Sequence, residues 1–512
     1  MADEFKKISK EENLKDPFAW PLLVTAVFLA ALTYKPVAQR LAAPFPLSPW
    51  ESTIVRDGWR VSNGESIYVL PDRGPATHMY GPLVTYISGT VFRLTGPSIC
   101  VPRGVAFVFA MLTVIAFPLV LLRGVDWSFG NSCLRLFVAA MTFAQFFRCR
   151  ALYAEARPDA AAAFFALAAI AILFMAHKNR SVFWLSMGTI AAVIGFFFKQ
   201  TAAAAALVPV VAVVCLRPKP FKAQLLMSLV PGTTLVLAIF LMRFFWYPGY
   251  YYLIEVPRSF SLQQGLSMQV LYYLVLCNKL FIVVTAIWLI QLLRKNQASF
   301  VRTQDKFVWS FAAVIVLGGV AWLGFVKHGG AINSFMPVFL AMAAFAAISL
   351  LHAKEWLRHM KFSWWAGALV AFGIGAIFLS DLQSIPRVWV LASTKTLIQG
   401  DTNYRRVIAR ASELPGTVIC FDDPTIPLLA SGYIGRNLNV ELDAVGKAYV
   451  PKSLLDEIQR ANWVIRVHGS WDELDARLNM TEQGFSIVED AVIDGPMYTL
   501  WKRGPSSTVL PP

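Results

Sequence analysis

Long apolar runs alternate with short polar loops along the first three quarters of the chain. A helix that crosses a bilayer needs about 20 mostly apolar residues, and by this criterion we predict about eleven spans. The pattern is typical of a polytopic α-helical membrane protein with a transmembrane module at 17–381. The predicted spans are residues 18–34, 101–122, 133–147, 159–175, 182–198, 202–215, 225–245, 270–293, 307–325, 332–351 and 364–379.

The remaining segment, 382–512, has a different pattern. An amphipathic helix is predicted at 407–415, and a buried strand at 416–421 is followed directly by two aspartates. A second helix, 454–462, leads into a second short strand, 463–467. Strands that alternate with helices indicate a small α/β domain with a parallel sheet.

A long polar segment separates the first two predicted spans, at residues 44–100. A short turn would be enough to return the chain to the bilayer, and long polar loops are more often functional than incidental. Its last part, 80–94, is short and is interrupted by Pro82 and Gly89, so we predict a helix in the membrane interface there rather than a further span. The ionisable side chains of the central part include Glu51, Asp57, Glu65, Asp72 and His78.

The composition agrees with a membrane protein, since 57% of the residues are hydrophobic and only 15% are charged. The net charge of +15 does not indicate nucleic-acid binding, because many basic residues lie in short loops between apolar runs. Basic loops mark the cytosolic side of a membrane protein. They place the N-terminal tail, 1–16, inside and the C-terminal domain outside the cytoplasmic membrane. The six cysteines have neither metal-ligand nor disulfide-framework spacing.

With this topology, five external loops carry ionisable or polar side chains. Charges at the edge of the hydrocarbon are costly and usually mark function. Five such loops on one side of the membrane are not expected by chance. The residues are Glu51, Asp57 and His78 in the first loop, Arg148, Arg150, Glu155, Arg157 and Asp159 in the second, Lys199 and Gln200 in the third, residues 247–258 in the fourth, and Lys327, His328 and Asn333 in the fifth.

Several of these residues also have a purely structural interpretation. Arg157 and Asp159 flank Pro158 and could cap a helix. His328 and Asn333 could belong to a turn around two glycines. Lys199 interrupts two apolar runs without a turn residue, which favours a phosphate-binding role.

Glu51 and Asp57 are the candidate acids. Either could act as a general base that removes a proton from an acceptor hydroxyl, and a carboxylate could also hold a divalent metal ion. A structural alternative is that Glu51 interacts with a helix N-terminus, where Ser48 can serve as the cap.

The sequence resembles the GT-C superfamily of integral-membrane glycosyltransferases, which includes protein O-mannosyltransferases and aminoarabinose transferases. The resemblance rests on Glu51 followed by DGWRVSNGESIY, and on the short motifs MYGPL, RPDAAAAFF, FKQT and HGGAINSFMP. In that superfamily an acid in the first external loop precedes a Gly-x-x-x-Tyr and a Tyr-x-Pro-Leu element, here 64–68 and 80–83. Several families have an Asp-Glu pair at the acid, whereas Ser52 follows Glu51 here, so the base stays open between Glu51, which is favoured, and Asp57.

The resemblance implies a glycosyltransferase that moves a sugar from a polyprenyl phosphate to a hydroxyl of a glycan, lipid or protein acceptor outside the cytoplasmic membrane, with inversion at the anomeric carbon. It implies no certain cofactor, although a divalent metal ion is compatible with it, and its partners include membrane lipids. A transporter or flippase and a non-catalytic scaffold are the alternatives. The implied roles are base for Glu51 or Asp57, donor phosphate binding for Lys199, Arg157 and Arg150, and substrate binding for Asp159, His78, Tyr80, Gln200, His328 and Asn333.

Overall fold

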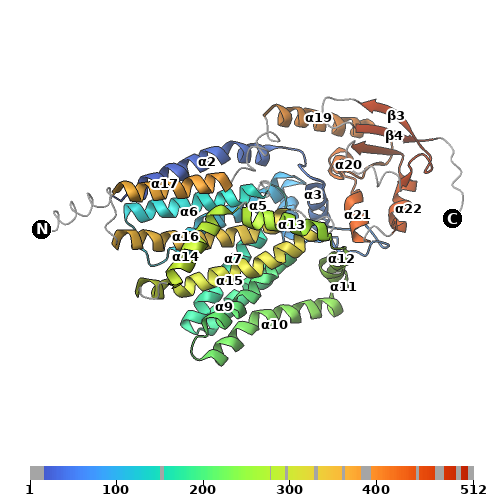
Figure 1. Cartoon of the computed structure of the whole chain (residues 1–512). Coiled ribbons are helices and arrows are strands. Elements are labelled where there is room, and N and C mark those ends of the chain that lie inside the picture. Colours follow the sequence, from blue (N-terminus) through green and yellow to red (C-terminus); the bar gives the residue numbers. More distant parts are fainter. Residues whose placement is uncertain are drawn as a thin grey trace.

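The computed structural model consists of a helical bundle with a small mixed α/β domain at one end (Figure 1). It describes residues 16–149, 155–276, 278–293, 298–327, 332–359, 364–381, 394–445, 449–467, 478–491 and 498–504. Residues 1–15, which are most of the predicted cytosolic tail, lie outside the described residues, and so do Arg150 and His328.

Every predicted span lies in a helical segment of the bundle. Two helical stretches, Ser267–Val275 and Lys279–Ile287, meet at an angle of 65° across a break. The helices are α2 (Ala19–Ala42), α5 (Cys100–Leu121), α6 (Phe129–Arg148), α7 (Asp159–Asn179), α8 (Val182–Phe198), η2 (Gln200–Leu207) with α9 (Val208–Leu216), α10 (Phe221–Phe245), α13 (Ser267–Leu271) with η5 (Tyr272–Leu276) and α14 (Lys279–Leu293), α15 (Ala298–Val326), η6 (Ile332–Phe335) with α16 (Met336–His359), and α17 (Trp364–Asp381).

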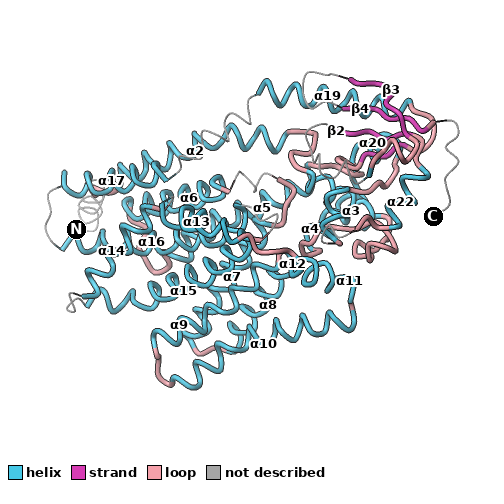
Figure 2. The backbone as a smooth tube through the Cα atoms, turned by 45° about the vertical axis from the view of Figure 1, so that its right-hand side comes forward, coloured by secondary structure: helices cyan, strands magenta, loops and turns pink. Residues whose placement is uncertain are grey.

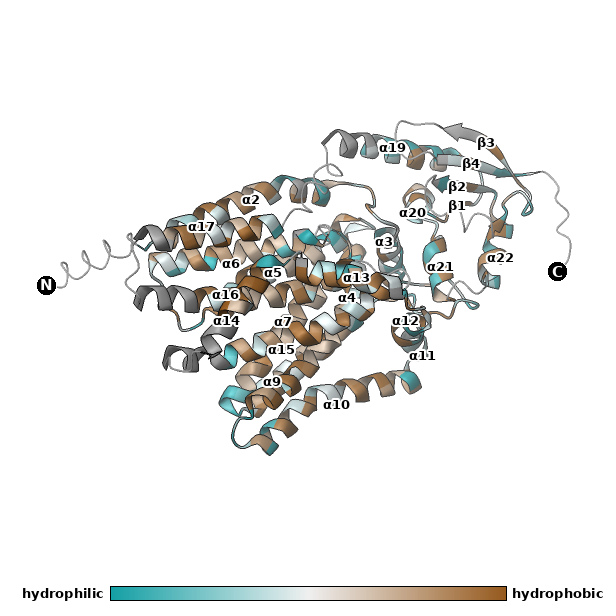
Figure 3. Cartoon of the chain, in the orientation of Figure 1, coloured by the Kyte–Doolittle hydropathy of each residue, from teal (hydrophilic) through white to brown (hydrophobic). Residues whose placement is uncertain are grey.

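Within the described residues, six helices are long and apolar enough to cross a membrane, or seven if the bent pair is one span. By length and composition alone, this is fewer than the eleven predicted spans. The remaining four predicted spans correspond to α6 and to the shorter apolar segments α8, η2–α9 and the end of α17. Hydrophobic residues predominate along the helices of the bundle, whereas hydrophilic residues are more frequent in the α/β domain (Figure 3).

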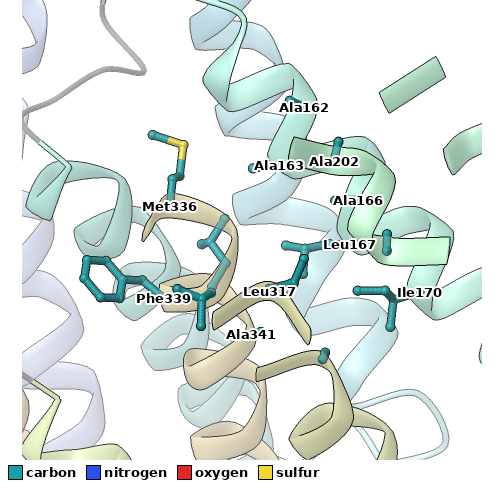
Figure 4. Packing of buried hydrophobic residues seen from close by; sticks show 14 of the residues in the cluster. Ala162, Ala163, Ala166, Leu167, Ile170, Ala202, Leu317, Met336, Phe339 and Ala341 are labelled. Carbon is teal, nitrogen blue, oxygen red and sulfur yellow. The ribbon is translucent and has the colours of Figure 1, made fainter. Parts of the chain in front are cut away.

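Small side chains let the central helices approach closely. Ala162, Ala163 and Ala166 of α7 face Ala202 of η2 and lie near α15 and α16 (Figure 4). The contact of α7 with α8 depends on Gly188, because a Cβ atom there would lie 2.7 Å from the Leu173 side chain. Close packing of small residues is a principal source of helix association where water cannot drive it. It fixes the ends of α7 and α8, where Asp159 and Lys199 are found.

The polar segment between α2 and α5 forms two helices and an irregular stretch between them. Helix α3 spans Pro49–Ser62, and α4 spans Leu83–Thr95. Ser48 occupies the N-cap position of α3 as predicted, but its side chain makes no capping hydrogen bond. Helix α4 matches the predicted helix at 80–94. It packs against α3, where Gly89 is needed because a Cβ atom there would lie 2.7 Å from the Gly58 carbonyl oxygen.

The C-terminal domain contains one four-stranded sheet in the order β1-β2-β4-β3. The predicted strands are present and parallel, as β1 (Val418–Cys420) and β2 (Trp463–Val467). The prediction of a parallel sheet holds for this pair alone, because β4 (Tyr498–Arg503) pairs antiparallel with both β2 and β3 (Phe485–Ala491). Only a short segment joins β3 to β4, and a parallel connection would need a much longer crossover.

Helices cover both faces of this sheet (Figure 2). Alternate side chains of β1 point to opposite sides, with Val418 and Cys420 toward α19 (Thr394–Glu413) and Ile419 toward α22 (Lys452–Arg460). Helices α20 (Thr425–Ser431) and α21 (Leu438–Ala444) lie between the sheet and the bundle. Helix α19 contains the predicted helix 407–415, apart from its last two residues, and α22 contains most of the predicted helix 454–462.

The domain is fixed to the polar segment by apolar and polar contacts. Leu428 of α20 packs with Val55 of α3. Glu441 of α21 is fully buried, and its Oε1 accepts a hydrogen bond from the Ala76 backbone N–H at 2.9 Å. Arg436 donates to the Gly74 carbonyl at 3.1 Å and lies 3.4 Å from Glu441. The α/β domain thus holds the loop that carries the candidate residues His78 and Tyr80.

Candidate functional site

Residues from all five predicted loops meet at the end of the bundle next to the α/β domain. Asp159 begins α7, and Lys199 follows the last residue of α8. The Lys199 ammonium contacts Asp159 Oδ1 at 2.5 Å, and Asn333 of η6 donates to the same oxygen at 3.2 Å. All three side chains are buried. Three residues predicted separately, from three loops, therefore form one cluster.

The second oxygen of Asp159 has a different environment. Oδ2 is buried and has no hydrogen-bond partner among the described residues. An unpartnered buried carboxylate oxygen is costly, and in a native structure it calls for an explanation such as a catalytic role or an absent ligand. Asp159 therefore has capacity left for a substrate group.

Tyr80 covers the Lys199 ammonium, which lies 5.4 Å from the centre of the Tyr80 ring. Burial raises the pKa of Tyr80, although Arg157 and Lys199 act in the opposite direction. The phenol therefore stays neutral at physiological pH and can donate a hydrogen bond. Tyr80 and Lys199 are therefore close together in space.

The backbone around Tyr80 is held at several points. Tyr68 Oη donates to the Tyr80 carbonyl at 2.5 Å, and the Gly81 N–H donates to the Phe198 carbonyl at 3.1 Å. Gln200 Nε2 donates to the carbonyls of Met79 and Leu253. Gln200 Nε2 is thus used for backbone contacts, and the role of Gln200 in substrate binding stays a prediction.

Gly81 is required at its position. A Cβ atom there would lie 1.9 Å from the Phe197 carbonyl oxygen, far inside van der Waals contact. Only glycine allows the two backbones to approach so closely.

A second charged group lies between this cluster and α2. Glu155 pairs with Arg40 at 3.1 Å through Oε1 and with Arg157 at 3.1 Å through Oε2. Burial raises the pKa of Glu155, while Arg157 and Arg40 favour its ionised form. Arg157 is a predicted phosphate ligand. Burial lowers the pKa of its guanidinium, but the nearby Tyr80, Glu155 and Asp159 outweigh burial, so that the pKa of Arg157 is raised.

Glu51, the favoured base in the sequence, is fully buried and fully bonded. Its Oε1 accepts from Arg103 Nε at 2.8 Å and from the Ala156 N–H at 2.6 Å. Its Oε2 accepts from Arg103 Nη2 at 2.7 Å and from the Leu47 N–H at 2.5 Å. These bonds tie α3 to α5 and to the turn that carries Glu155 and Arg157. A general base needs a free lone pair toward the acceptor proton, and each oxygen of this carboxylate already accepts two hydrogen bonds.

Asp57 is also enclosed. Its Oδ1 accepts from Arg56 at 2.7 Å and lies 3.4 Å from Arg60, and its Oδ2 accepts from Thr77 at 2.5 Å. Burial disfavours the charge, but Arg56 and Arg60 outweigh it and hold the pKa of Asp57 below the ordinary value. A carboxylate with a lowered pKa and no exposed oxygen is a weak base.

His78 lies beside Asp57 and is uncharged at neutral pH. Burial lowers its pKa to about 4. Its Nε2 lies 2.8 Å from Thr85 Oγ1 of α4, and its ring centre lies 5.6 Å from that of Tyr80. The predicted substrate contact of His78 would have to be made by a neutral imidazole.

The sequence-based prediction missed Arg103 and Arg40, which form the ion pairs with Glu51 and Glu155. Arg103 lies inside a predicted span, and a charge within an apolar run is itself a signal of function or of a buried partner. Arg150 and His328 lie outside the described residues. In the described part of the chain, no three His, Cys, Asp or Glu side chains are grouped as metal ligands. The carboxylates of the site are paired with Lys or Arg, which does not fit a divalent cation.

No protein-family model matches the sequence, and no curated protein matches it. Solved structures do match. ArnT from Cupriavidus metallidurans, in the apo state, aligns with a TM-score of 0.55 at 11% identity over 94% of this chain and 99% of that chain. The same protein bound to undecaprenyl phosphate gives a TM-score of 0.53.

A second protein has the same architecture. The archaeal oligosaccharyltransferase AglB from Archaeoglobus fulgidus, in complex with an inhibitory peptide and a dolichol-phosphate, aligns with a TM-score of 0.51 at 12% identity, over 96% of this chain and 75% of that chain. The chain therefore shares the fold of ArnT and AglB, in agreement with the resemblance at the level of the fold alone.

Proposed function

We propose that this protein is a membrane glycosyltransferase that moves a sugar from a polyprenyl phosphate to an acceptor hydroxyl, at the extracytoplasmic face of the cytoplasmic membrane. The observation that carries the proposal is the cluster of Asp159, Lys199, Asn333 and Tyr80, in which Asp159 Oδ2 has no protein partner. ArnT, which has the same fold, is a protein crystallised with undecaprenyl phosphate. This supports a lipid-phosphate donor for the present chain.

The roles follow from charge and geometry. Cations that face the donor phosphate stabilise the charge that develops on it as the sugar leaves. Lys199 and Arg157 are assigned to this task, and Arg150 remains a further candidate. Asn333 and Tyr80 supply an amide and a neutral phenol for sugar hydroxyls.

The base is assigned to Asp159 in preference to Glu51 and Asp57, because only Asp159 keeps an unbonded carboxylate oxygen among these three acids. Asp159 takes the proton of the acceptor hydroxyl, the acceptor oxygen bonds to the anomeric carbon, and the bond from that carbon to the phosphate oxygen breaks. Polyprenyl phosphate leaves with the bonding electrons. Attack opposite the leaving group inverts the anomeric configuration.

Glu51 then has a positioning role. Through the Ala156 N–H it holds the turn that carries Glu155 and Arg157, and through Arg103 it fixes this turn to α5.

The test uses undecaprenyl phosphates that carry different radiolabelled hexoses and pentoses, presented to the purified chain in liposomes with membrane glycolipids, glycans or proteins as acceptors. We expect label to leave the polyprenyl fraction and to enter an acceptor with at least one donor. A transporter would move the intact labelled lipid across the bilayer without breaking the sugar–phosphate bond. Such movement, with no transfer from any donor, would contradict the proposal.

A further inference from the structure

Basic side chains gather at the end of the bundle that lies away from Asp159 and from the α/β domain (Figure 1). They come from the loop between α7 and α8, from the loop between α9 and α10, and from the first half of α15. The residues are Lys178, Arg180, Arg217, Lys219, Lys222 and Lys306. The three segments that carry them, 176–182, 214–224 and 305–309, contain a single acid, Asp305. Within the part of the chain that the structure describes, none of the six cations is in a salt bridge.

Direct contacts bring the three basic segments together. His177 Nδ1, near the end of α7, lies 2.5 Å from Gln224 Oε1 of α10, and Gln224 Nε2 donates to the His177 carbonyl at 3.3 Å. The His177 ring also packs against Trp309 of α15, with ring centres 5.3 Å apart. Arg180 donates to the Lys219 carbonyl at 2.6 Å. The cations of the three segments are therefore held at one place.

Two of these cations repel each other. Lys178 is exposed and Lys306 is half-buried, and they lie close enough for their charges to interact. Lys306 Nζ donates to the Leu121 carbonyl at the end of α5, at 3.2 Å. The partial negative charge of a helix C-terminus offsets only part of a full positive charge. An anion beside the two ammonium groups would replace their repulsion by attraction.

Two of the arginines have an uncommon backbone conformation. Arg180 and Arg217 directly follow the last residues of α7 and α9, with φ angles of 50° and 47°. In this left-handed region glycine is favoured, because it has no Cβ atom. Glycine or asparagine would end either helix at a lower conformational cost. Arginine at both positions therefore indicates that the positive charge is used at this end of the bundle.

Exposed apolar side chains flank the cations. Val182 and Phe183 begin α8 and are 74% and 64% exposed, and Phe221 begins α10 and is 37% exposed. Such side chains can pack against acyl chains while neighbouring Lys and Arg side chains reach the lipid head groups. The combination suits a ligand with an apolar body and an anionic head.

We propose that this end of the bundle binds the head group of an anionic phospholipid, with Lys178 and Lys306 at its phosphate and Arg180 beside them. Basic loops in general mark the cytosolic side of a membrane protein. The feature that indicates a binding site is the convergence of cations from three segments on one place. The proposal does not depend on the proposed function, because this lipid carries no sugar and lies at the opposite end of the bundle from Asp159.

The test compares the binding of phosphatidylglycerol and of phosphatidylcholine, with the same acyl chains, to the purified protein by native mass spectrometry. The variant carries Lys178→Gln and Lys306→Gln, and glutamine can still donate to the Leu121 carbonyl. The control carries Arg93→Gln and Arg243→Gln, which remove two exposed cations at the other end of the bundle. Lys178→Gln alone changes only an exposed position and serves if the double variant has a lower Tm.

We expect the wild type and the control to bind phosphatidylglycerol about tenfold more tightly than phosphatidylcholine, since each basic side chain near a head group adds to the attraction. The double variant should lose most of this preference, and Lys178→Gln alone should lose part of it. Equal binding of the two lipids by the wild type, or the same loss in the control as in the double variant, would overturn the proposal. Displacement of phosphatidylglycerol by inorganic phosphate at the same concentration would also overturn it, because the site would then bind free anions.

Discussion

At the residue scale, the contacts of each acid separate a catalytic role from a positioning role. Asp159 and Glu51 are both buried acids next to a cation, and sequence spacing alone does not rank them. Their hydrogen bonds distinguish the two acids, because Glu51 accepts four hydrogen bonds whereas Asp159 keeps one oxygen without a partner. Removing the charge of each should therefore have different consequences.

Glu51→Gln should destabilise the protein. It leaves the fully buried Arg103 guanidinium without its counter-ion, and breaking one side of a buried pair typically costs about 3–5 kcal/mol. We expect a clear fall in the Tm measured in detergent, together with a secondary loss of transfer. Arg103→Met with Glu51→Met, which removes both charges, should recover much of the Tm. A Glu51→Gln variant with the wild-type Tm and no transfer would instead identify Glu51 as the base.

Lys199→Ala should act on the donor. Loss of the ammonium beside Tyr80 removes a cation from the assigned phosphate site, and removing one such stabilising group costs about 10²–10³ in kcat. Relative to the wild type, we expect the KM for the donor to rise more than the KM for the acceptor, and kcat to fall. Lys199→Arg should retain part of the activity. A rise in acceptor KM alone would contradict the phosphate assignment.

At the scale of elements, Gly81 positions Tyr80 against the end of α8. Gly81→Ala places a methyl group 1.9 Å from the Phe197 carbonyl oxygen. The backbone segment that carries Tyr80 must therefore move. We expect lower transfer activity and weaker donor binding. Gly319→Ala on α15 is the control, since a Cβ atom there has no neighbour within 4 Å. Equal behaviour of the two variants would show that the approach of Tyr80 to Lys199 does not matter.

The contact between the α/β domain and the polar segment should weaken as pH rises. Burial raises the pKa of Glu441 to about 7 from the ordinary 4.5, although Arg436 and Arg56 favour its charged form. Because the folded state binds this proton more tightly than the unfolded state, the stabilisation is complete below pH 4.5 and is lost as pH rises through about 7.

Limited proteolysis of the domain between about pH 5 and pH 8, on either side of the Glu441 pKa of about 7, measures this effect. We expect faster cleavage at the higher pH. Glu441→Gln stays neutral throughout and still offers an oxygen to the Ala76 N–H. It should therefore be cleaved at the same rate across this range. A wild-type protein with no pH dependence would contradict the docking role of Glu441.

Much of the fold could be predicted from the sequence, and much of the site could not. The length of the apolar runs located a helix for every predicted span, and strand β2 was predicted with its observed bounds. The antiparallel strands β3 and β4 were missed, because their pattern depends on pairing with each other. Asp159, Lys199 and Asn333 were recognised as polar exceptions near apolar runs. Choosing between the candidate acids required the positions of Arg103 and Arg56, because the ion pairs that these side chains form with Glu51 and Asp57 cannot be read from the sequence.

At the scale of the whole molecule, the orientation in the membrane decides which compartment the site faces. Cys100 begins α5 at the end of the bundle that carries the site, and Cys215 lies near the end of α9 at the other end; both are exposed. In intact cells, a membrane-impermeant thiol reagent should label a Cys277→Ser variant but not a variant that carries both Cys277→Ser and Cys100→Ser. Cys215 should become reactive only after permeabilisation. The reverse order would place the site in the cytoplasm.

The central claim is that Asp159 removes the acceptor proton during transfer from a polyprenyl phosphate. The most direct measurement is the single-turnover rate of Asp159→Asn with a donor that the wild type accepts. General-base catalysis contributes about 10²–10⁴ in rate, so we expect a loss of at least about 100-fold per folded protein, with binding of undecaprenyl phosphate retained. The Tm should also fall, because the variant leaves the buried Lys199 ammonium without its counter-ion. Transfer by Asp159→Asn at the wild-type rate would contradict this account.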